Sequence, residues 1–198
     1  MQILLVGTQC GLFLYQRDGA ALVLLRQLLE DLAIIAIEDL GSGVLRVAGS
    51  DGSVRQSYDA GVSWHPDAGS PPAPLAPTNA LTTHGPVPLQ NPRLRGATAH
   101  ARLGGRAPIL IGAGAGGMMI FRSEDDGIHW QAAQMLGGPY GNVTTLAPDL
   151  DRRDVAWAAT DQGAILRSGD RGTTWKHAAQ APCGVRCLLC QRASARSE

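Results

Sequence analysis

Residues 57–64 read SYDAGVSW, and nearly the same eight residues return twice further along the chain. They return as SEDDGIHW at 123–130 and as SGDRGTTW at 168–175, so the shared pattern is Ser-x-Asp-x-Gly-x-(Ser/Thr/His)-Trp. A weaker fourth copy, QRDGAALV at 16–23, keeps Asp18. It has Gln16, Ala20 and Val23 where the other copies have serine, glycine and tryptophan. A recurrence of this kind is typical of a repeat architecture.

Each copy of the pattern predicts a tight hairpin turn. The side-chain oxygens of Ser57 and Asp59 can accept hydrogen bonds from nearby backbone N–H groups, and Gly61 tolerates a positive φ. Trp64 then covers the turn from the outgoing strand, where its indole N–H finds an acceptor. The same roles are expected of Ser123, Asp125, Gly127, Trp130, Ser168, Asp170, Gly172 and Trp175. The aspartates are therefore interpreted as turn-forming residues, not as catalytic residues or metal ligands.

Short strand patterns surround each turn. Residues 143–150, 155–163 and 164–175 give a first strand, a second strand and a third strand with its turn, and 33–40, 44–52 and 53–64 repeat this order. The stretches 97–103, 108–116 and 118–130 follow the same order again. Four short strands in about 40–45 residues are typical of one β-propeller blade. The fold class predicted is an all-β propeller of four-stranded antiparallel blades.

The two ends of the chain predict how such a ring closes. Residues 2–8 and 11–16 align with second and third strands, and 21–29 with an outer strand although its leucines favour a helix. Residues 185–190, VRCLLC, have the register of a first strand. Pairing the two termini gives about four complete blades and removes an exposed sheet edge. The alternative is a part-propeller that dimerises, or a fragment of a longer chain.

The domain organisation predicted is a single propeller over 1–190, followed by a polar tail at 191–198. The pattern aspartates are spaced by 41, 66 and 45 residues, from positions 18, 59, 125 and 170. The excess in the middle gap coincides with 66–92, which holds eight prolines. Prolines cannot supply a ladder of N–H donors, so this stretch is interpreted as an insertion between blades.

The repeated pattern resembles the Asp-box, or BNR, repeat of sialidase-like β-propellers. Families with this repeat include sialidases, sortilin-type receptors and the photosystem II assembly factors. The resemblance implies a propeller whose turns lie at the periphery, away from the functional face. It does not discriminate between a glycoside hydrolase and a binding protein.

Composition excludes several classes of function. The formal net charge is zero, so no overall field attracts nucleic acid or an anionic membrane. No run of about 18 apolar residues predicts a membrane span, and the opening MQILLVGTQCG lacks the basic start of a secretory signal. A cytoplasmic location is therefore expected. Residues 68–123 contain no acid but five arginines, which indicates either a solvated insertion or a docking patch for an acidic partner.

The four cysteines leave three possibilities open. Cys183, Cys187 and Cys190 have the C-x3-C-x2-C spacing of an iron–sulfur motif, but too few residues follow for the barrel that accompanies it. A zinc site would need a fourth ligand, for which His177 or Cys10 would be the nearest candidates. The interpretation favoured is that Cys187 replaces Thr145 of the preceding repeat in a buried strand. The histidines are scattered singly, so no metal and no cofactor are expected.

The function predicted is non-enzymatic binding or scaffolding of a protein, peptide or glycan. The expected contact loops precede inner strands at 91–95, 137–142 and 183–186. The candidate ligand-binding residues are Arg93, Arg95, Arg102, Tyr140 and Arg186. The alternative is a sialidase-like hydrolase, which would need a tyrosine nucleophile paired with Glu and three converging arginines. Tyr140 is the candidate tyrosine. No glutamate occurs between Glu38, at a strand end, and Glu124, inside a repeated turn.

Overall fold

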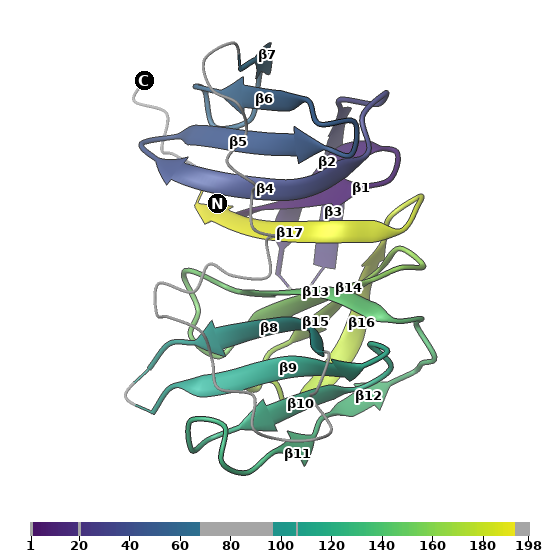
Figure 1. Cartoon of the computed structure of the whole chain (residues 1–198). Coiled ribbons are helices and arrows are strands. Elements are labelled where there is room, and N and C mark those ends of the chain that lie inside the picture. The colour runs from purple at the N-terminus through teal and green to yellow at the C-terminus, as the bar shows by residue number, and fades with distance from the viewer. Residues whose placement is uncertain (1, 20, 68–96, 106, 193–198) are drawn as a thin grey trace.

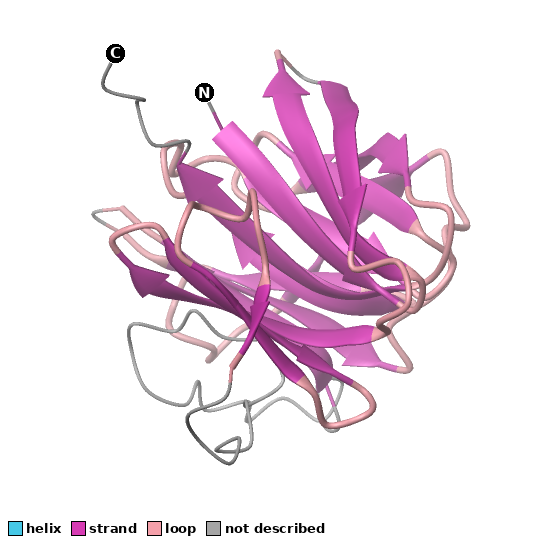
Figure 2. Cartoon of the chain, turned by 90° about the horizontal axis from the view of Figure 1, so that it is seen from above, coloured by secondary structure: helices cyan, strands magenta, loops and turns pink. Residues whose placement is uncertain are grey.

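The computed structural model of the chain shows a four-bladed β-propeller (Figure 1). It describes residues 2–19, 21–67, 97–105 and 107–192. Within these ranges there are strands and turns but no helix (Figure 2), and therefore no helix that could cross a membrane. Most of the proline-rich insertion predicted at 66–92, and residues 193–198 of the predicted tail, lie outside the described residues.

Blade 1 is built from both ends of the chain. The sheet order β17-β1-β2-β3 places the C-terminal strand innermost, and β17 pairs antiparallel with β1 from Gln2↔Arg192 to Thr8↔Val185. This confirms the predicted closure of the ring. It also confirms the strand assignment of the leucine-rich segment 21–29. The bounds are β1 (Gln2–Thr8), β2 (Gly11–Asp18), β3 (Ala21–Leu28) and β17 (Val185–Arg192).

The other blades follow the chain in order from an inner to an outer strand. Blade 2 comprises β4 (Ile34–Gly41), β5 (Val44–Gly49), β6 (Val54–Ser57) and β7 (His65–Pro66). Blade 3 comprises β8 (Ala97–Leu103), β9 (Ile109–Ala115), β10 (Ile120–Ser123) and β11 (Gln131–Ala132). Blade 4 comprises β13 (Val143–Pro148), β14 (Ala156–Thr160), β15 (Ala164–Ser168) and β16 (Thr174–Gln180).

Blade 4 has a fifth strand that the repeat pattern does not predict. The segment β12 (Gln134–Leu136) leaves blade 3 and pairs parallel with β16, from Gln134↔Thr174 to Leu136↔Lys176. The backbone N–H of Gln134 also bonds the carbonyl of Thr173 at 2.9 Å. The crossing chain thus covers the outer edge of the next blade.

The hydrophobic core lies between neighbouring blades. Between blades 4 and 1 it contains Trp157, Phe13 and Leu188, and between blades 1 and 2 it contains Leu12, Ile37 and Leu189. Between blades 3 and 4 many members are alanines around Trp175. Strands buried on both faces lose the simple alternation of apolar and polar residues, which explains the continuous apolar runs in the sequence.

The antiparallel order creates two distinct faces. The turns at 57–64, 123–130 and 168–175 follow third strands, and they lie on the same side as the ends of the inner strands; we call this side the turn face. The chain that enters inner strands, at 137–142 and 181–184, lies at the opposite side, which we call the loop face.

A disulfide joins the two chain ends on the loop face. Cys10, in the turn between β1 and β2, bonds Cys183, just before β17, with the two Cα atoms 6.5 Å apart. Beside it, the N–H of Gln9 donates to the carbonyl of Gly184 at 3.2 Å. The disulfide reinforces the closure between β1 and β17.

The disulfide also resolves the possibilities left open for the cysteines. Cys187 and Cys190 are free but buried in β17, and burial raises the pKa of both thiols, to about 12 for Cys190. No group of three metal-ligating side chains exists in the described part of the chain. Cys187 is 1% exposed and Thr145 is 0% exposed, so both occupy buried positions of inner strands.

Replacing both Cys10 and Cys183 with serine should lower the free energy of unfolding by about 2–5 kcal/mol, because the cross-link restricts the unfolded chain. The bond closes a sequence separation of 173 residues. Urea denaturation of wild type and variant measures the difference. A reductant should shift the wild-type midpoint but not that of the variant, and equal midpoints for the two oxidised proteins would contradict the role given to the bond.

Candidate functional site

The three repeated turns share one hydrogen-bond network. In the first, the hydroxyl of Ser57 donates to Asp59 Oδ1 at 2.8 Å and accepts from the N–H of Gly61 at 2.8 Å. Ser123 and Ser168 make the same pair of bonds in their own turns. The residue before each glycine, namely Ala60, Asp126 or Arg171, also has a positive φ. The serine thus ties both arms of a turn in which two successive residues are left-handed.

The carboxylate of each turn aspartate contacts the residue that precedes the tryptophan. Their Oδ2 atoms lie 2.6 Å from the hydroxyl of Ser63, Nδ1 of His129 and the hydroxyl of Thr174. Bonds from the side chain and then the N–H of Ser63 lower the pKa of Asp59 to about 2. The N–H and then the ring of His129 lower the pKa of Asp125 to about 2.

The third aspartate is held in the same way. Burial alone would raise the pKa of Asp170, but hydrogen bonds from Thr174, Ser168 and Thr173 outweigh burial and lower it. A carboxylate that accepts this many bonds has little basicity left for proton transfer.

The tryptophans differ between copies. Trp130 and Trp175 donate their indole N–H to the carbonyls of Gly127 (2.8 Å) and Gly172 (3.2 Å). Nε1 of Trp64 is buried and has no hydrogen-bond partner among the described residues. In the weak fourth copy the turn after Asp18 is held instead by Arg17, whose Nε donates to the carbonyl of Gly19 at 2.9 Å.

The carboxylates of Asp59 and Asp125 should titrate near pH 2, well below the ordinary value of about 3.9. Because the folded pKa is lowered, these turns contribute stability above about pH 4 and lose it as the pH falls through about 2. Carboxyl-carbon NMR titration measures this directly, and the Asp59→Asn variant should remove the pH dependence of its turn. Midpoints near 3.9 would show that the turn bonds are weak in solution.

The ligand-binding residues expected from the sequence do not form one cluster in the described structure. Arg186 is exposed at the start of β17 and Tyr140 precedes β13, both on the loop face. Arg102 lies near the end of β8 on the turn face, where Nη2 is 3.3 Å from Oδ1 of Asp126. Arg93 and Arg95 lie outside the described residues.

The groups expected of a hydrolase are also separated. The hydroxyl of Tyr140 donates to the carbonyl of Leu136, and its ring stacks on His177 with ring centres 5.8 Å apart. Glu124 is on the turn face, where it pairs with Arg122, and Glu38 faces Arg46 in blade 2. The described residues therefore do not bring Tyr140 and either glutamate together.

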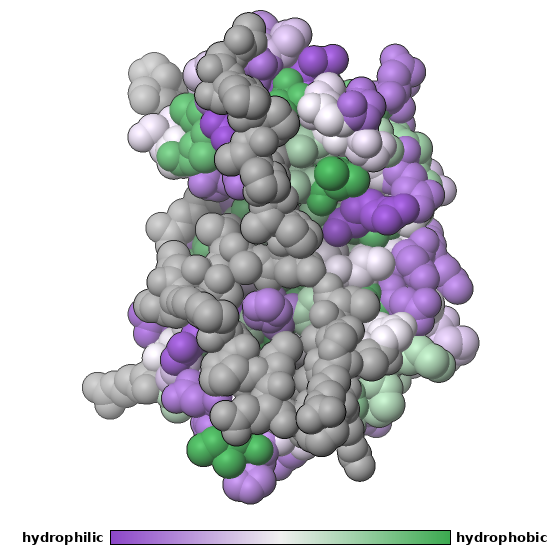
Figure 3. Space-filling view, viewed as in Figure 1, coloured by the Kyte–Doolittle hydropathy of each residue, from purple (hydrophilic) through white to green (hydrophobic). Residues whose placement is uncertain are grey.

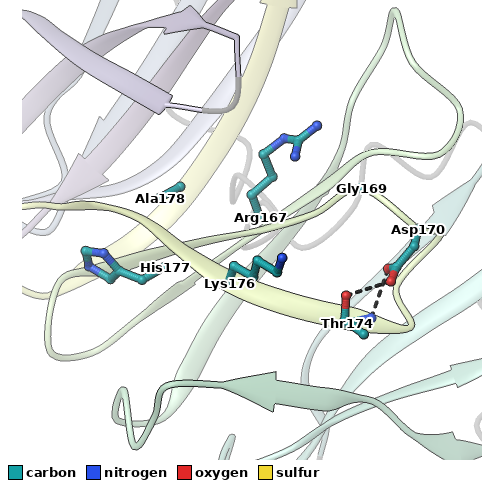
Figure 4. A pocket seen from close by; sticks show the side chains of 7 residues that line it. All are labelled: Arg167, Gly169, Asp170, Thr174, Lys176, His177 and Ala178. Carbon is teal, nitrogen blue, oxygen red and sulfur yellow. Dashed lines mark hydrogen bonds between the residues drawn. The ribbon is translucent and has the colours of Figure 1, made fainter.

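A cationic groove on the turn face is the site that the structure adds. Arg167 on β15 stands directly opposite Lys176 on β16, and its guanidinium lies 6.0 Å from the ring centre of Trp157. A cavity of about 310 Å³ opens beside them, lined by Arg167, Gly169, Asp170, Thr174, Lys176, His177 and Ala178. Figure 4 shows Arg167 and Lys176 on adjacent strands, with the Asp170–Thr174 bonds beyond them and His177 further along β16.

Arg167 has no hydrogen bond or ion pair within the described part of the chain, and its Nε is buried without a partner. The same position before the turn in blade 3 is Arg122, which pairs with Glu124 and bonds the carbonyl of Arg171. In blade 4 the residue equivalent to Glu124 is Gly169, whose missing Cβ would lie 3.2 Å from Nη1 of Arg167. Blade 4 therefore lacks the carboxylate that pairs with the equivalent arginine in blade 3. Arg167 has no acidic partner among the described residues.

Further arginines add to the positive charge around Arg167. Desolvation by burial is the main cause that lowers the pKa of Arg167, and Arg17 and Arg152 lower it further, while Asp149 opposes them. A second cavity of about 320 Å³ is lined by Gln2, Arg17, Gly19, Asp151 and Arg152. An anion placed here would meet cations from both blade 1 and blade 4.

Asp149 connects these two blades next to the groove. Its Oδ2 is 3.1 Å from Nη1 of Arg17, with the two side chains 0% and 9% exposed. Its Oδ1 accepts the N–H groups of Asp151 (2.9 Å) and Arg152 (3.0 Å), which fixes the loop that carries Arg152. The remaining nitrogen of Arg17, Nη2, is buried without a partner.

The acidic member of the first cavity does not neutralise this charge by a direct bond. Oδ1 of Asp170 bonds Ser168 and the N–H of Thr174, and Oδ2 bonds the hydroxyl of Thr174. The turn therefore orients the carboxylate toward its own backbone. Arg167 and Lys176 remain available to a ligand.

The sequence did not predict this groove, because the contact residues were expected in the loops before inner strands. One signal was present in the aligned repeats: Ser-Glu-Asp at 123–125 becomes Ser-Gly-Asp at 168–170 after the same arginine. Loss of a carboxylate beside a retained arginine indicates a cation that the chain itself does not neutralise.

Comparison with known proteins adds little beyond the fold. No protein-family model and no curated protein matches this chain. A chain in a crystal structure of a nidogen/laminin complex is 12% identical, with a TM-score of 0.40, over 93% of this chain and 64% of that one. The GH74 enzyme of Niastella koreensis is 12% identical, with a TM-score of 0.36, over 92% of this chain and 25% of that one.

A third structure, YCF48 bound to a D1 peptide, is 16% identical, with a TM-score of 0.27, over 87% of this chain and 76% of that one. The chain spans less than two thirds of the length of the first two proteins. At such identities and TM-scores these similarities indicate no function.

Proposed function

We propose that this chain is a non-catalytic binding or scaffolding propeller that holds an acidic segment of a partner protein in the groove of Arg167 and Lys176. The observation that carries the proposal is the guanidinium of Arg167, which has no hydrogen bond or ion pair to the described residues and stands directly opposite a second cation. Like charges directly opposite each other in a sheet are destabilising, and a carboxylate between them converts repulsion into attraction.

The chemistry of the two cations matches a carboxylate. A guanidinium offers two parallel N–H donors to one carboxylate, and an ammonium adds a third donor from the neighbouring strand. The groove is positioned on β-strands, so its geometry is set before the partner arrives. Hydrogen bonds to charged groups contribute about 1.5–3 kcal/mol each, or about 10- to 150-fold in affinity.

Two further assignments belong to this proposal. We assign the three turns to the Asp-box (BNR) type, on the support of their shared Ser–Asp network. The cytoplasmic location stays a prediction, and the Cys10–Cys183 bond favours an oxidising compartment instead, since cytosolic thiols are kept reduced.

A fluorescein-labelled hexaglutamate peptide, titrated at low salt and followed by anisotropy, tests the groove. Arg167→Gln and Lys176→Gln should each weaken binding at least about tenfold, because each removes a charge-assisted contact. Arg122→Gln is the matched control: it changes the equivalent arginine of blade 3, which Glu124 already neutralises, and should leave affinity unchanged.

The converse variant is Gly169→Glu. It restores the carboxylate that blade 3 has at this position, so it should occupy Arg167 internally and abolish peptide binding while the protein stays folded. Competition with sulfate and with succinate, both dianions at neutral pH, separates general anion binding from a preference for carboxylate. The proposal fails if wild type does not bind the peptide, if sulfate competes better than succinate, or if Gly169→Glu binds as wild type does.

A further inference from the structure

The outer edge of blade 1 differs from the outer edges of the other blades. Its outer strand, β3, is 8 residues long, whereas β7 and β11 are 2 residues each. The other long outer strand, β16, has 7 residues and is covered by β12. Within the described residues, no strand pairs with the outer edge of β3.

The side chains on β3 are apolar although the strand is exposed. Val23, Leu24 and Leu25 are 50%, 48% and 46% exposed, and Arg26 is the one charged residue of the strand. On the parts of the face in Figure 3 that the grey atoms leave visible, hydrophobic residues form small separate groups among hydrophilic ones. β3 lies behind that face, at the back of the molecule in Figure 1. A long open edge with aliphatic side chains is a template for pairing with another strand.

We propose that β3 pairs antiparallel with β3 of a second copy of this chain, across a two-fold axis. The pairing joins two blade 1 sheets into one continuous sheet of eight strands. It is independent of the groove proposed above, because β15 and β16 take no part in it.

Charge and register select a second copy as the occupant. A two-fold axis through the sheet keeps each side chain on its own face, so the residue at the axis stands opposite itself. An axis at Val23 sets Val23 opposite Val23 of the other copy and Leu22 opposite Leu24, so every pair in this run is aliphatic. Arg26 lies beyond the run, and no like charges meet. A peptide with charged side chains would set them against the aliphatic run 21–24, whereas a second β3 supplies a matching aliphatic edge.

The way the chain finishes blade 4 supports the same mode of contact. There an extended segment, β12, adds to the outer edge of β16 through backbone hydrogen bonds from Gln134 to Leu136. Edge addition is therefore already used within this fold where an outer strand is long. Blade 1 has an equally long outer strand and no segment of the described chain on it.

A bulge limits the strength of the predicted pairing. β3 shifts register against β2 between Leu24 and Arg26, so Leu25 is an extra residue. Such a bulge increases twist and interrupts an edge, which leaves 21–24 as the regular run. The dimer is therefore expected to be weak and to dissociate on dilution.

Light scattering on a sizing column, from about 1 µM to about 1 mM of protein, tests the proposal. Wild type should pass from the monomer mass of 20.8 kDa toward twice that value. Leu24→Lys should remain monomeric, because lysine at an edge keeps its charge in water and disfavours pairing. Ile128→Lys makes the same kind of change at another exposed aliphatic residue, in blade 3, and should dimerise as wild type does.

Arg167→Gln should also dimerise normally, which separates this result from the test of the groove. Circular dichroism melting of each variant shows that it is folded. A wild-type mass of 20.8 kDa at every concentration would overturn the proposal, as would a polymer without a limiting size, or a dimer that Leu24→Lys leaves intact.

Discussion

The pairing of β1 with β17 is the constraint on which this propeller depends. It joins residues 2–8 to residues 185–192, and blade 1 would otherwise lack its inner strand. The fit at this seam is close: a Cβ on Gly7 would lie 2.3 Å from Sγ of Cys187 and 2.7 Å from Cγ2 of Ile34. Only a residue without a side chain allows β17 and β4 to approach β1 from both sides.

Two further interactions support blade 1 from opposite faces. On the loop face the Cys10–Cys183 bond links the turns that lead into β2 and β17. On the turn face the buried Arg17–Asp149 pair connects blade 1 to blade 4. Breaking a buried pair by removing one partner leaves an uncompensated charge, so this contact specifies how the two blades sit together. The groove around Arg167 lies close to this pair. Its arginines, Arg17, Arg152 and Arg167, come from blades 1 and 4 and are near each other because these two blades are adjacent.

The sequence was sufficient for the fold because the blades repeat. Aligning 164–175 with 53–64 predicted strands and turns, and the same register assigned the leucine-rich segment 21–29 to a strand against its helix propensity. Tertiary context overrides propensity here, since β3 is held by its hydrogen bonds to β2. The parallel addition of β12 was missed, because a short crossing segment has no periodicity of its own.

The site was less predictable, for a physical reason. The partner of a side chain is set by the packing of blades that are distant in sequence, as for Cys10 and Cys183 or Arg17 and Asp149. The local spacing of Cys183, Cys187 and Cys190 left an iron–sulfur or zinc site open beside the favoured buried-strand interpretation. Contacts between distant segments decide their roles, since Cys183 bonds Cys10 while Cys187 and Cys190 are free and buried. Arg102 was grouped with Tyr140 and Arg186 by strand position, but it stands at the far end of its strand on the turn face. The open state of Arg167 follows from one substitution in the repeat, at Gly169.

Amide hydrogen exchange of β17 tests the closed ring most directly. If both termini complete one blade, the β17 amides that face β1 should be as strongly protected as those of Ala158 and Ala159 in β14 of blade 4, because both strands are buried and paired in a sheet. Exchange of the β17 amides at the rate of a frayed terminus, with β14 still protected, would show that the ring is open in solution and would contradict the account.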